Sequence, residues 1–493
     1  MSELQTVIFC FIRALIPLLV LTVWPSASRA QLPEPVARML RTANIPQEAL
    51  GTVVMRLPGG VAVLSHGEEH SLQPGSTIKL LTTLVALDTL GPAYRGRTEL
   101  RTDGRIEDGT LHGDLVLRGG GDADLRWEAL QEMLQTLRNR GVEAIRGDLL
   151  LDRQLFNPPR PDLGIAPFDE APEFEYNLVP DALLLNGNLL RFDLESDERR
   201  LRVSMSPSLE GVSVESDMTL DDLDCRNWDR DWLPPEYFKA GDGSIRILLH
   251  GKFPRNCAKS PSINVLDRVD FADRLFRILW KRLGGTFVGN TRDAVMPPGT
   301  RVLAEHLSRP LPVVVRDINK FSDNALARLL YLTLGAMAVG TANGDVATAV
   351  LSERVVRSWM REHGISDKGL VLDNGSGLSR LERISASQLA AVLLSASRNV
   401  LAPEYLSSLP LAAVDGSMRL RLKDSPAAGR ARIKTGTLNG VFGVAGYVPD
   451  AAGRMNIVVG LLNHETTGNA TGRAILDALI DWVARSGATP SAH

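Results

Sequence analysis

A serine and a lysine three residues apart, Ser76 and Lys79, stand at the start of an apolar run with helical spacing. Side chains three positions apart share a helix face, so Lys79 can reach the Ser76 hydroxyl and the two can act as nucleophile and general base. A solvated helix surface is the alternative. Apolar residues behind the pair predict a helix anchored in a core, with its first turn at a surface or cleft: Ile78, Leu81, Leu84, Val85 and Leu87.

Two later motifs carry polar groups of the same kind. A Ser-Asp-Asn sequence at 322–324 precedes an apolar stretch, and a Lys-Thr-Gly-Thr sequence occupies 434–437. Residues 431–438, 441–448 and 457–462 predict three neighbouring antiparallel strands, and a glycine in such a strand lets a ligand backbone approach closely. Each motif alone has a plain alternative, a helix cap for the first and an ordinary edge strand with one lysine for the second.

In this order, the three motifs resemble the signature of serine β-lactamases and penicillin-binding proteins. The long separation between positions 76 and 322 is similar to the class C low-molecular-mass penicillin-binding proteins. This is the D-alanyl-D-alanine carboxypeptidase/endopeptidase family (peptidase S13, DacB-like), in which extra domains are inserted between the first two motifs. Residues 117–124, 373–380 and 414–421 also resemble segments of this family.

The resemblance implies a serine carboxypeptidase and endopeptidase that cleaves peptidoglycan peptides through an acyl-enzyme and is inhibited by β-lactams. Ser76 would attack the carbonyl with Lys79 as base, and the N–H groups of Ser76 and Thr437 would hold the oxyanion. The implied catalytic residues are Ser76, Lys79, Ser322, Asn324 and Lys434. The implied substrate-binding residues are Thr435, Gly436, Thr437, Arg380 and Asp169.

Some of these roles carry finer expectations. Ser322 would relay a proton to the departing D-alanine, and Asn324 would hold the substrate amide. A nearby ammonium on Lys434 would favour the neutral form of Lys79 that a base requires. Arg380 would pair with the carboxylate of diaminopimelate, and Asp169 with its ammonium.

Two other functions remain open from the sequence. A serine β-lactamase would need an efficient deacylation base, and the long insert is atypical of that class. A non-catalytic cell-wall-binding protein on the same fold would normally have lost part of the motifs, and all three are intact here.

The resemblance implies an α/β (α+β) multidomain protein. A transpeptidase-like domain is expected from residues 31–95 and 312–493, around an insert at 96–311 of one or two smaller, strand-rich α+β domains. The length of 493 residues, 44% of them hydrophobic, suits two or three globular domains. The insert is predicted to contain a strand at 144–152, preceded by a helix with one apolar face formed by Ala129, Leu130, Met133, Leu134 and Leu137.

Residues 1–30 are typical of a secretory signal peptide. Residues 7–24 are apolar apart from Arg13, and Ser-Arg-Ala at 28–30 offers small residues before a cleavage point. An uncleaved anchor is the alternative, because Glu3 opposes Arg13. Export predicts a periplasmic or secreted protein with at most peripheral membrane association, since no later stretch is long and apolar enough to span a bilayer.

Cys225 and Cys257 are the only cysteines after the predicted signal peptide. An even pair in a protein exported to an oxidising compartment predicts a disulfide. Two buried free thiols are the alternative.

Charge and spacing argue against several other functions. The formal net charge of −3 gives no nucleic-acid footprint. A His-Gly-Glu-Glu-His sequence at 66–70 matches the H-x-x-E-H zinc pattern, but it follows a predicted strand and contains a glycine, so a metal-binding helix is not expected. The acidic run at 221–231 lacks calcium-loop spacing. No metal or other cofactor is expected.

Overall fold

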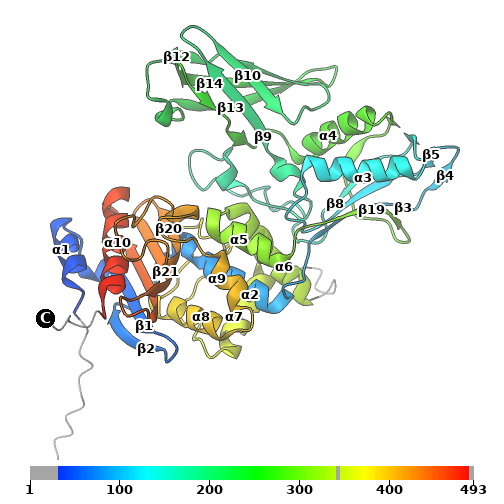
Figure 1. Ribbon diagram of the computed structural model, residues 1–493. Helices are drawn as coiled ribbons and strands as arrows, with labels where there is room; N and C mark the ends of the chain where they lie inside the picture. Colours follow the sequence, from blue (N-terminus) through cyan, green and yellow to red (C-terminus); the bar gives the residue numbers. More distant parts are fainter. Residues whose placement is uncertain (1–30, 340–344, 488–493) are drawn as a thin grey trace, which may run out of the picture.

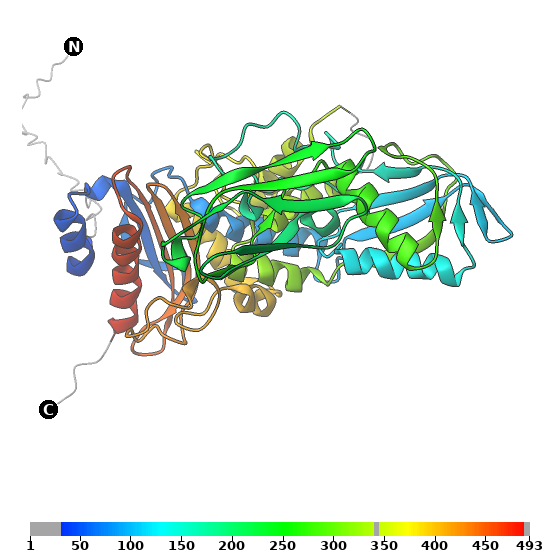
Figure 2. The same ribbon diagram turned by 90° about the horizontal axis from the view of Figure 1, so that it is seen from above.

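The computed structural model describes residues 31–339 and 345–487. The predicted signal peptide, residues 1–30, therefore lies outside the described residues. In Figure 1 the two ends of the chain, blue and orange to red, lie together at the lower left. The cyan and green middle of the chain extends above and to the right, and Figure 2 shows the resulting elongated shape.

Both ends of the chain contribute to one five-stranded sheet. Its strand order is β2-β1-β22-β21-β20, and every neighbouring pair is antiparallel. The three predicted C-terminal strands are confirmed as neighbours, with β20 at the edge. The strands are β1 (Leu50–Arg56), β2 (Val61–His66), β20 (Arg432–Leu438), β21 (Val441–Pro449) and β22 (Met455–Asn463).

Helices cover both faces of this sheet (Figure 1). Successive side chains of a strand point to opposite faces, and on β1 Val53 joins one apolar core whereas Val54 joins the other. The Val54 core includes α1 (Glu34–Thr42) and α10 (Asn469–Arg485). The opposite side holds α2 (Lys79–Leu90), α5 (Leu311–Phe321), α6 (Asn324–Val339), α7 (Thr348–Glu362), α8 (Ala386–Arg398) and α9 (Ala402–Ser408).

The middle of the chain begins and ends in an α+β unit. One sheet has the order β18-β8-β6-β3-β19 and a smaller one β17-β7-β5-β4. The strands are β3 (Arg97–Thr102), β4 (Arg105–Glu107), β5 (Thr110–His112), β6 (Leu115–Gly120), β7 (Ala144–Ile145), β8 (Leu149–Asp152), β17 (Thr286–Phe287), β18 (Thr291–Asp293) and β19 (Arg301–Leu307). The helices are α3 (Trp127–Asn139) and α4 (Arg268–Arg282).

Two sequence predictions fall in this unit. The predicted amphipathic helix is α3, and all five residues of its predicted apolar face are buried. The predicted strand at 144–152 is wrong as one element, because β7 and β8 belong to different sheets. The chain breaks at Gly147, where a Cβ would lie 2.2 Å from the Gly113 carbonyl oxygen, so this backbone crossing requires a glycine.

A second unit of the middle region consists of strands. Its sheets have the orders β10-β9-β15, with β16 also on β9, and β11-β14-β12, with β13 also on β14. The predicted disulfide is present between Cys225 and Cys257, whose Cα atoms are 5.5 Å apart. The strands are β9 (Leu190–Ser196), β10 (Leu201–Ser206), β11 (Val212–Ser216), β12 (Thr219–Asp221), β13 (Trp232–Lys239), β14 (Ile245–Pro254), β15 (Ala258–Lys259) and β16 (Ser262–Ile263).

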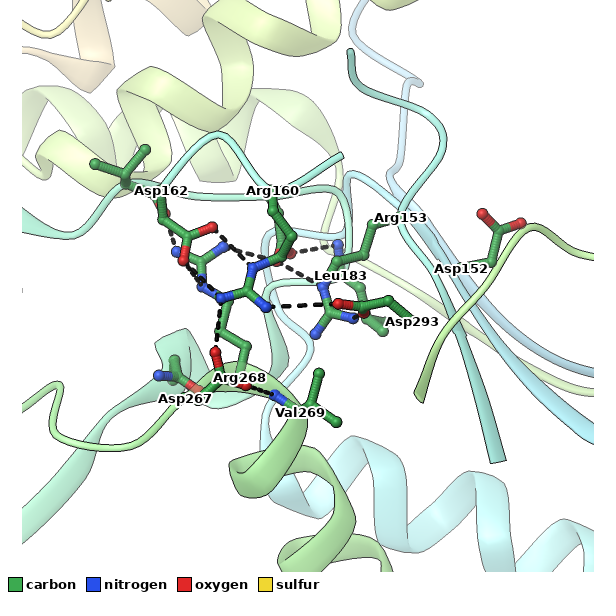
Figure 3. Close-up of polar contacts among 12 residues, drawn as sticks. Asp152, Arg153, Arg160, Asp162, Leu183, Asp267, Arg268, Val269 and Asp293 are labelled. Carbon is green, nitrogen blue, oxygen red and sulfur yellow. Dashed lines mark hydrogen bonds and ion pairs between the residues drawn. The ribbon is translucent and has the colours of Figure 1, made fainter. Parts of the chain in front are cut away.

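A network of ion pairs, hereafter the joint, links the loop between β8 and β9 to α4 and β18 (Figure 3). Asp181 is fully buried and accepts from Arg153, which follows β8, at 2.7 Å and from Arg268, on α4, at 2.6 Å. Arg160 pairs with Asp267 at 2.9 Å, directly before α4. Burial pushes the pKa of Asp181 up, but the charges and hydrogen bonds of Arg268 and Arg153 together hold that pKa below its usual value.

The predicted α/β (α+β) multidomain class is confirmed, with several separate sheets and helices on them. The division of the chain at residues 95/96 and 311/312 stays a prediction. Across residues 31–339 and 345–487, no helix combines the length and apolar character needed to cross a membrane.

Candidate active site

The Ser-x-x-Lys motif lies at the junction of two helical segments. Ser76 belongs to a 3-10 turn, Gly75–Ile78, and Lys79 is the first residue of α2. Residues three apart lie directly above each other in 3-10 geometry, and the Lys79 Nζ to Ser76 Oγ distance is 3.0 Å. The apolar residues behind them are buried. The structure thus brings the expected nucleophile and base into contact on a rigidly packed helix.

The three partners of Lys79 can accommodate a neutral amine as well as an ammonium. Besides Ser76, its Nζ contacts the Asn324 Oδ1 at 2.7 Å and the carbonyl oxygen of Ser376. A neutral amine has two N–H donors, which suit these two acceptors, and one lone pair, which can accept the Ser76 hydroxyl proton. The three contacts therefore supply what a base aimed at Ser76 needs.

Burial is the main reason that Lys79 can be neutral. Its side chain is fully buried, which lowers its pKa from 10.5 to about 7 even though the charges of Glu382 and Asp323 raise it. From the sequence, the ammonium of Lys434 was expected to lower the pKa of Lys79. The direction agrees, but the cause differs, because the low-polarity surroundings disfavour the charged form by themselves.

Ser322 and Lys434 form a second serine–lysine contact. Ser322 ends α5 in a left-handed conformation with φ of 62°, so the Ser-Asp-Asn motif is a turn between α5 and α6. Lys434 is fully buried on β20, and its Nζ donates to Ser322 Oγ at 2.9 Å and to the Thr435 carbonyl at 2.8 Å. Burial, then the charge of Lys79, hold the pKa of Lys434 well below its usual value.

Strand β20 packs directly on the Ser76 turn. A Cβ at Gly436 would lie 2.8 Å from the Ser76 nitrogen and 2.6 Å from the Pro74 carbonyl oxygen. Gly377 meets the same turn from another loop, since a Cβ there would lie 2.1 Å from the Gly75 carbonyl oxygen. Glycine at 436 is therefore required by the enzyme's own backbone, and it leaves the next residue, Thr437, beside Ser76.

Asn324 connects the site to the inserted region. Its Oδ1 accepts from Lys79, and its Nδ2 donates to the carbonyl oxygen of Tyr176 at 2.9 Å. Tyr176 belongs to a 3-10 turn, Glu175–Asn177, which comes before β9. A main-chain carbonyl from the middle of the chain thus contacts the same asparagine that accepts from Lys79.

Sequence reasoning missed Glu382, which shapes the loop at 373–380. Its carboxylate is fully buried and accepts from the backbone N–H groups of Gly375 at 2.7 Å, Gly377 at 2.9 Å and Asn374 at 3.1 Å. Burial raises its pKa although these hydrogen bonds oppose the rise. Because this loop presents the Ser376 carbonyl to Lys79, Glu382 helps to position the Lys79 side chain. No spacing rule in the sequence pointed to it.

Arg380 and Asp169 lie in the same neighbourhood but do not pair with each other. The Arg380 guanidinium lies 5.6 Å from the ring centre of Phe168, the neighbour of Asp169, and donates to the Asn439 carbonyl at 3.0 Å. The Asp169 carboxylate accepts from the Tyr176 hydroxyl and the Asn177 amide, both at 2.7 Å. Asp169 therefore holds its own loop together.

A pocket opens beside Ser76. Ser417 belongs to the segment at 414–421, and its hydroxyl accepts from Thr435 at 2.7 Å. Sequence reasoning had noted that segment without assigning Ser417 a place in the site. The lining residues are Ser76, Ser322, Gly416, Ser417, Arg419, Leu420, Arg421, Thr435, Thr437 and Arg473.

The part of the chain that the structure describes contains no group of three His, Cys, Asp or Glu side chains placed to hold a metal ion. The His-Gly-Glu-Glu-His segment leaves β2 at His66 without forming a helix. The Nε2 of His66 instead contacts the Gln47 carbonyl oxygen at 3.0 Å.

Comparison with known proteins agrees with this arrangement. The chain is 28% identical over 469 residues to a D-alanyl-D-alanine carboxypeptidase of Actinomadura sp. (strain R39), covering 92% of this chain and 84% of that protein. It is 25% identical over 443 residues to the D-alanyl-D-alanine carboxypeptidase DacB of Haemophilus influenzae, covering 87% and 88%. The crystal structure of penicillin-binding protein 4 (dacB) from H. influenzae shares the fold, with a TM-score of 0.74, 22% identity and coverage of 91% and 99%.

A family model covers nearly the whole described chain. The model of the D-Ala-D-Ala carboxypeptidase 3 (S13) family matches residues 32–486, a range that includes both serine–lysine contacts and the entire insert. The protein therefore belongs to the D-Ala-D-Ala carboxypeptidase 3 (S13) family.

Proposed function

We propose that this protein is a serine D-alanyl-D-alanine carboxypeptidase and endopeptidase of the cell wall, acting on peptidoglycan peptides through an acyl-enzyme. The observation that carries the proposal is the buried Lys79, with a pKa of about 7, in contact with Ser76. Family membership and the names of the relatives, both D-alanyl-D-alanine carboxypeptidases, support this function over that of a serine β-lactamase.

Acylation would start at Ser76. The proton of its hydroxyl passes to the lone pair of Lys79 as Oγ bonds to the carbonyl carbon that precedes the terminal D-alanine. The negative charge that develops on the carbonyl oxygen would be held by the N–H groups of Ser76 and Thr437. The close packing of Gly436 on the Ser76 nitrogen supports this pairing of donors.

Departure of the amine would use the second serine–lysine contact. As the carbon–nitrogen bond breaks, Ser322 gives its proton to the leaving nitrogen and recovers one from Lys434, 2.9 Å away. The hydroxyls of Thr435 and Thr437 would receive the terminal carboxylate, because both line the pocket beside Ser76. A docked carboxylate would favour the protonated form of Lys434.

Deacylation completes the cycle. Before it, the protonated Lys79 releases its proton to solvent and Lys434 takes one up, so both lysines return to their starting states. Water then attacks the ester carbon as Lys79 takes its proton, and Lys79 gives that proton to Ser76 Oγ as the ester bond breaks. A peptide amine in place of D-alanine makes the same reaction an endopeptidase cleavage of a cross-link. Penicillins would acylate Ser76 by the same attack, and their release would be slow, since the residues that line the pocket include no carboxylate to serve as a dedicated deacylation base.

The side chain of the substrate would lie near Asn324 and the insert. Asn324 would hold the substrate amide, and Arg380 would face a carboxylate of diaminopimelate. The position of Arg380 beside Phe168 supports this placement. Asp169 would face the ammonium, and its contacts with Tyr176 and Asn177 would keep its carboxylate oriented.

The reaction requires a location outside the cytoplasmic membrane. We propose that residues 1–30 act as a cleaved signal peptide and that the mature enzyme is periplasmic or secreted, with at most peripheral membrane contact. Its predicted disulfide, present between Cys225 and Cys257, suits an oxidising compartment.

Product analysis tests the function directly. Purified enzyme incubated with monomeric pentapeptide muropeptides should release D-alanine, and with cross-linked dimers it should release monomers. Benzylpenicillin should add once per chain, on the peptide that contains Ser76, as seen by intact-protein and peptide mass spectrometry. Ser76→Ala should lose both products and the adduct. An adduct that persists in Ser76→Ala, or wild-type enzyme that yields neither product, contradicts the proposal.

A further inference from the structure

One wall of the pocket beside Ser76 is strongly basic. Three arginines line it, Arg419 and Arg421 from the loop after Ser417 and Arg473 from α10, and its lining includes no carboxylate. Arg421 is neutralised by Asp477 at 2.7 Å. Arg419 and Arg473 are exposed and form no ion pair with any described residue.

The lack of a partner for Arg473 is specific to its position. On the same helix, Arg485 pairs with Asp481 at 2.7 Å, one turn away. Like charges gathered at one place repel each other and gain no ion-pair energy in return. Two unpaired guanidinium groups at the rim of a pocket that contains Ser76 therefore form a ready site for an anion, and guanidinium binds carboxylate in a planar, two-bonded geometry.

The basic wall lies on the side from which the leaving amine departs. The same pocket holds Ser322, Thr435 and Thr437, which in the proposed function meet the leaving nitrogen and its carboxylate. Asn324 is not part of its lining and instead contacts Tyr176 of the insert. Figure 1 shows α10 and α6, which begins at Asn324, on opposite sides of β20 and β21.

We propose that Arg419 and Arg473 bind carboxylates of the second stem peptide, the one that leaves as an amine when a cross-link is cleaved. This inference rests on the proposed function and names the substrate that this side of the site favours. A released D-alanine carries one carboxylate, which the hydroxyls of Thr435 and Thr437 receive. A leaving stem peptide carries further carboxylates at a greater distance, so it alone reaches the two arginines.

The test compares two substrates on the same variants. Arg419→Gln, Arg473→Gln and the double variant are assayed for kcat/KM on a cross-linked muropeptide dimer and on a pentapeptide monomer. The ratio of dimer to monomer kcat/KM should fall about tenfold for each single variant, the scale of losing a hydrogen bond between charged groups. Arg473→Lys should recover part of the ratio. Arg430→Gln, an exposed arginine outside the pocket lining, should leave the ratio at the wild-type value.

A modified substrate separates binding from structural damage. In a modified dimer, the leaving strand keeps the carboxylate beside the scissile amide, and its other carboxylates are amidated. The wild type should cleave this dimer more slowly than the unmodified one, whereas the double variant should not distinguish the two. A ratio unchanged in the double variant, or equal sensitivity of wild type and double variant to amidation, overturns the inference. Wild-type enzyme that cleaves neither substrate instead refutes the proposed function, so the two failures are distinct.

Discussion

Buried cations occur in two regions of this molecule, with opposite arrangements. At the candidate active site, Lys79 and Lys434 are fully buried, and neither forms an ion pair with a described carboxylate. At the joint within the insert, Arg153 and Arg268 are nearly as deeply buried, and both contact the carboxylate of Asp181.

The two arrangements suit different roles, proton transfer at the candidate active site and structural support at the joint. A buried lysine without a carboxylate escapes the cost of desolvation by releasing its proton, which makes it a base. A guanidinium stays charged under all ordinary conditions, so its burial requires a partner that is charged too. The active site uses the residue that can become neutral, and the joint uses the residue that cannot.

The largest effect is expected from removing the base. Lys79→Met keeps an unbranched side chain but has no proton acceptor, so the second-order rate of acylation by benzylpenicillin should fall by a factor of about 10²–10⁴. Stopped-flow or quenched mass spectrometry measures this rate. Thermal unfolding of the same variant should change less than that of an Asp181 variant. Acylation at the wild-type rate would show that Lys79 is not the base.

A substitution at the joint should lower stability rather than the acylation rate. Asp181→Asn removes the buried carboxylate that Arg153 and Arg268 share and leaves them only the more exposed Asp293 and Asp162. The free energy of unfolding should fall by roughly 3–5 kcal/mol. The lowered pKa of Asp181 means that its stabilisation is present above the pKa of the unfolded state and is lost as pH falls through the folded-state pKa.

Chemical denaturation at several pH values measures both consequences. Asp224→Asn, which removes an exposed carboxylate paired with Arg226, is the matched control and should change stability little. Folded Asp181→Asn should still be acylated at a rate close to wild type. Equal stability losses in Asp181→Asn and Asp224→Asn would contradict the special role of the buried ion pairs.

Glu382 is a buried carboxylate at the active site, so its replacement sharpens the comparison. Glu382→Gln places an amide N–H group against backbone N–H groups and should slow acylation by roughly 10–100-fold, the scale of one or two buried hydrogen bonds left unmade. Removal of its charge also disfavours the protonated form of Lys79.

The pH profile tests whether Glu382 acts as a positioning residue. In Glu382→Gln the rise of the acylation rate should occur at lower pH than in wild type, a shift that mere unfolding does not produce. Glu362→Gln, an exposed glutamate on α7, is the control. A slower rate with an unmoved profile would restrict Glu382 to a structural role.

The smallest effect is expected from pH alone. Because the pKa of Lys79 is about 7 and its neutral form is the proposed base, the acylation rate should rise through pH 7 and reach a plateau above it. At pH 6 the rate should be about one tenth of the plateau, since one pH unit below the pKa about ten of every eleven Lys79 side chains are protonated and inactive. A rate that is flat between pH 6 and 8 would contradict a neutral Lys79.

Local sequence predicted the parts of the site that depend on spacing. The three-residue step from Ser76 to Lys79 and the glycine at 436 both specify geometry within one segment, and both motifs lie in elements close to those expected. The turn at Ser322 differs from a plain helix start, because α5 ends there in a left-handed residue that helix spacing does not reveal.

Contacts between distant segments could not be predicted in this way. The carbonyl of Tyr176 contacts Asn324 from the insert. Glu382, which lies outside the loop at 373–380, accepts hydrogen bonds from the backbone of that loop. The pKa of Lys79 is lowered mainly by burial, to which distant segments contribute, and the charge of Lys434 that the sequence suggested is not among its main causes. The split of β7 from β8 depends on a backbone crossing at Gly147 that is likewise invisible in hydrophobic pattern.

The shared sheet sets an order of events during biosynthesis. Strand β1 pairs with β22, and the Thr52 hydroxyl donates to the carbonyl of Val459, 407 residues later. A growing chain that has already exposed Ser76 still lacks the strand that carries Lys434, and pairing over such a separation forms late in folding. Hydrolytic activity therefore begins only after the last strands have been synthesised and paired, so an unfinished chain is inactive.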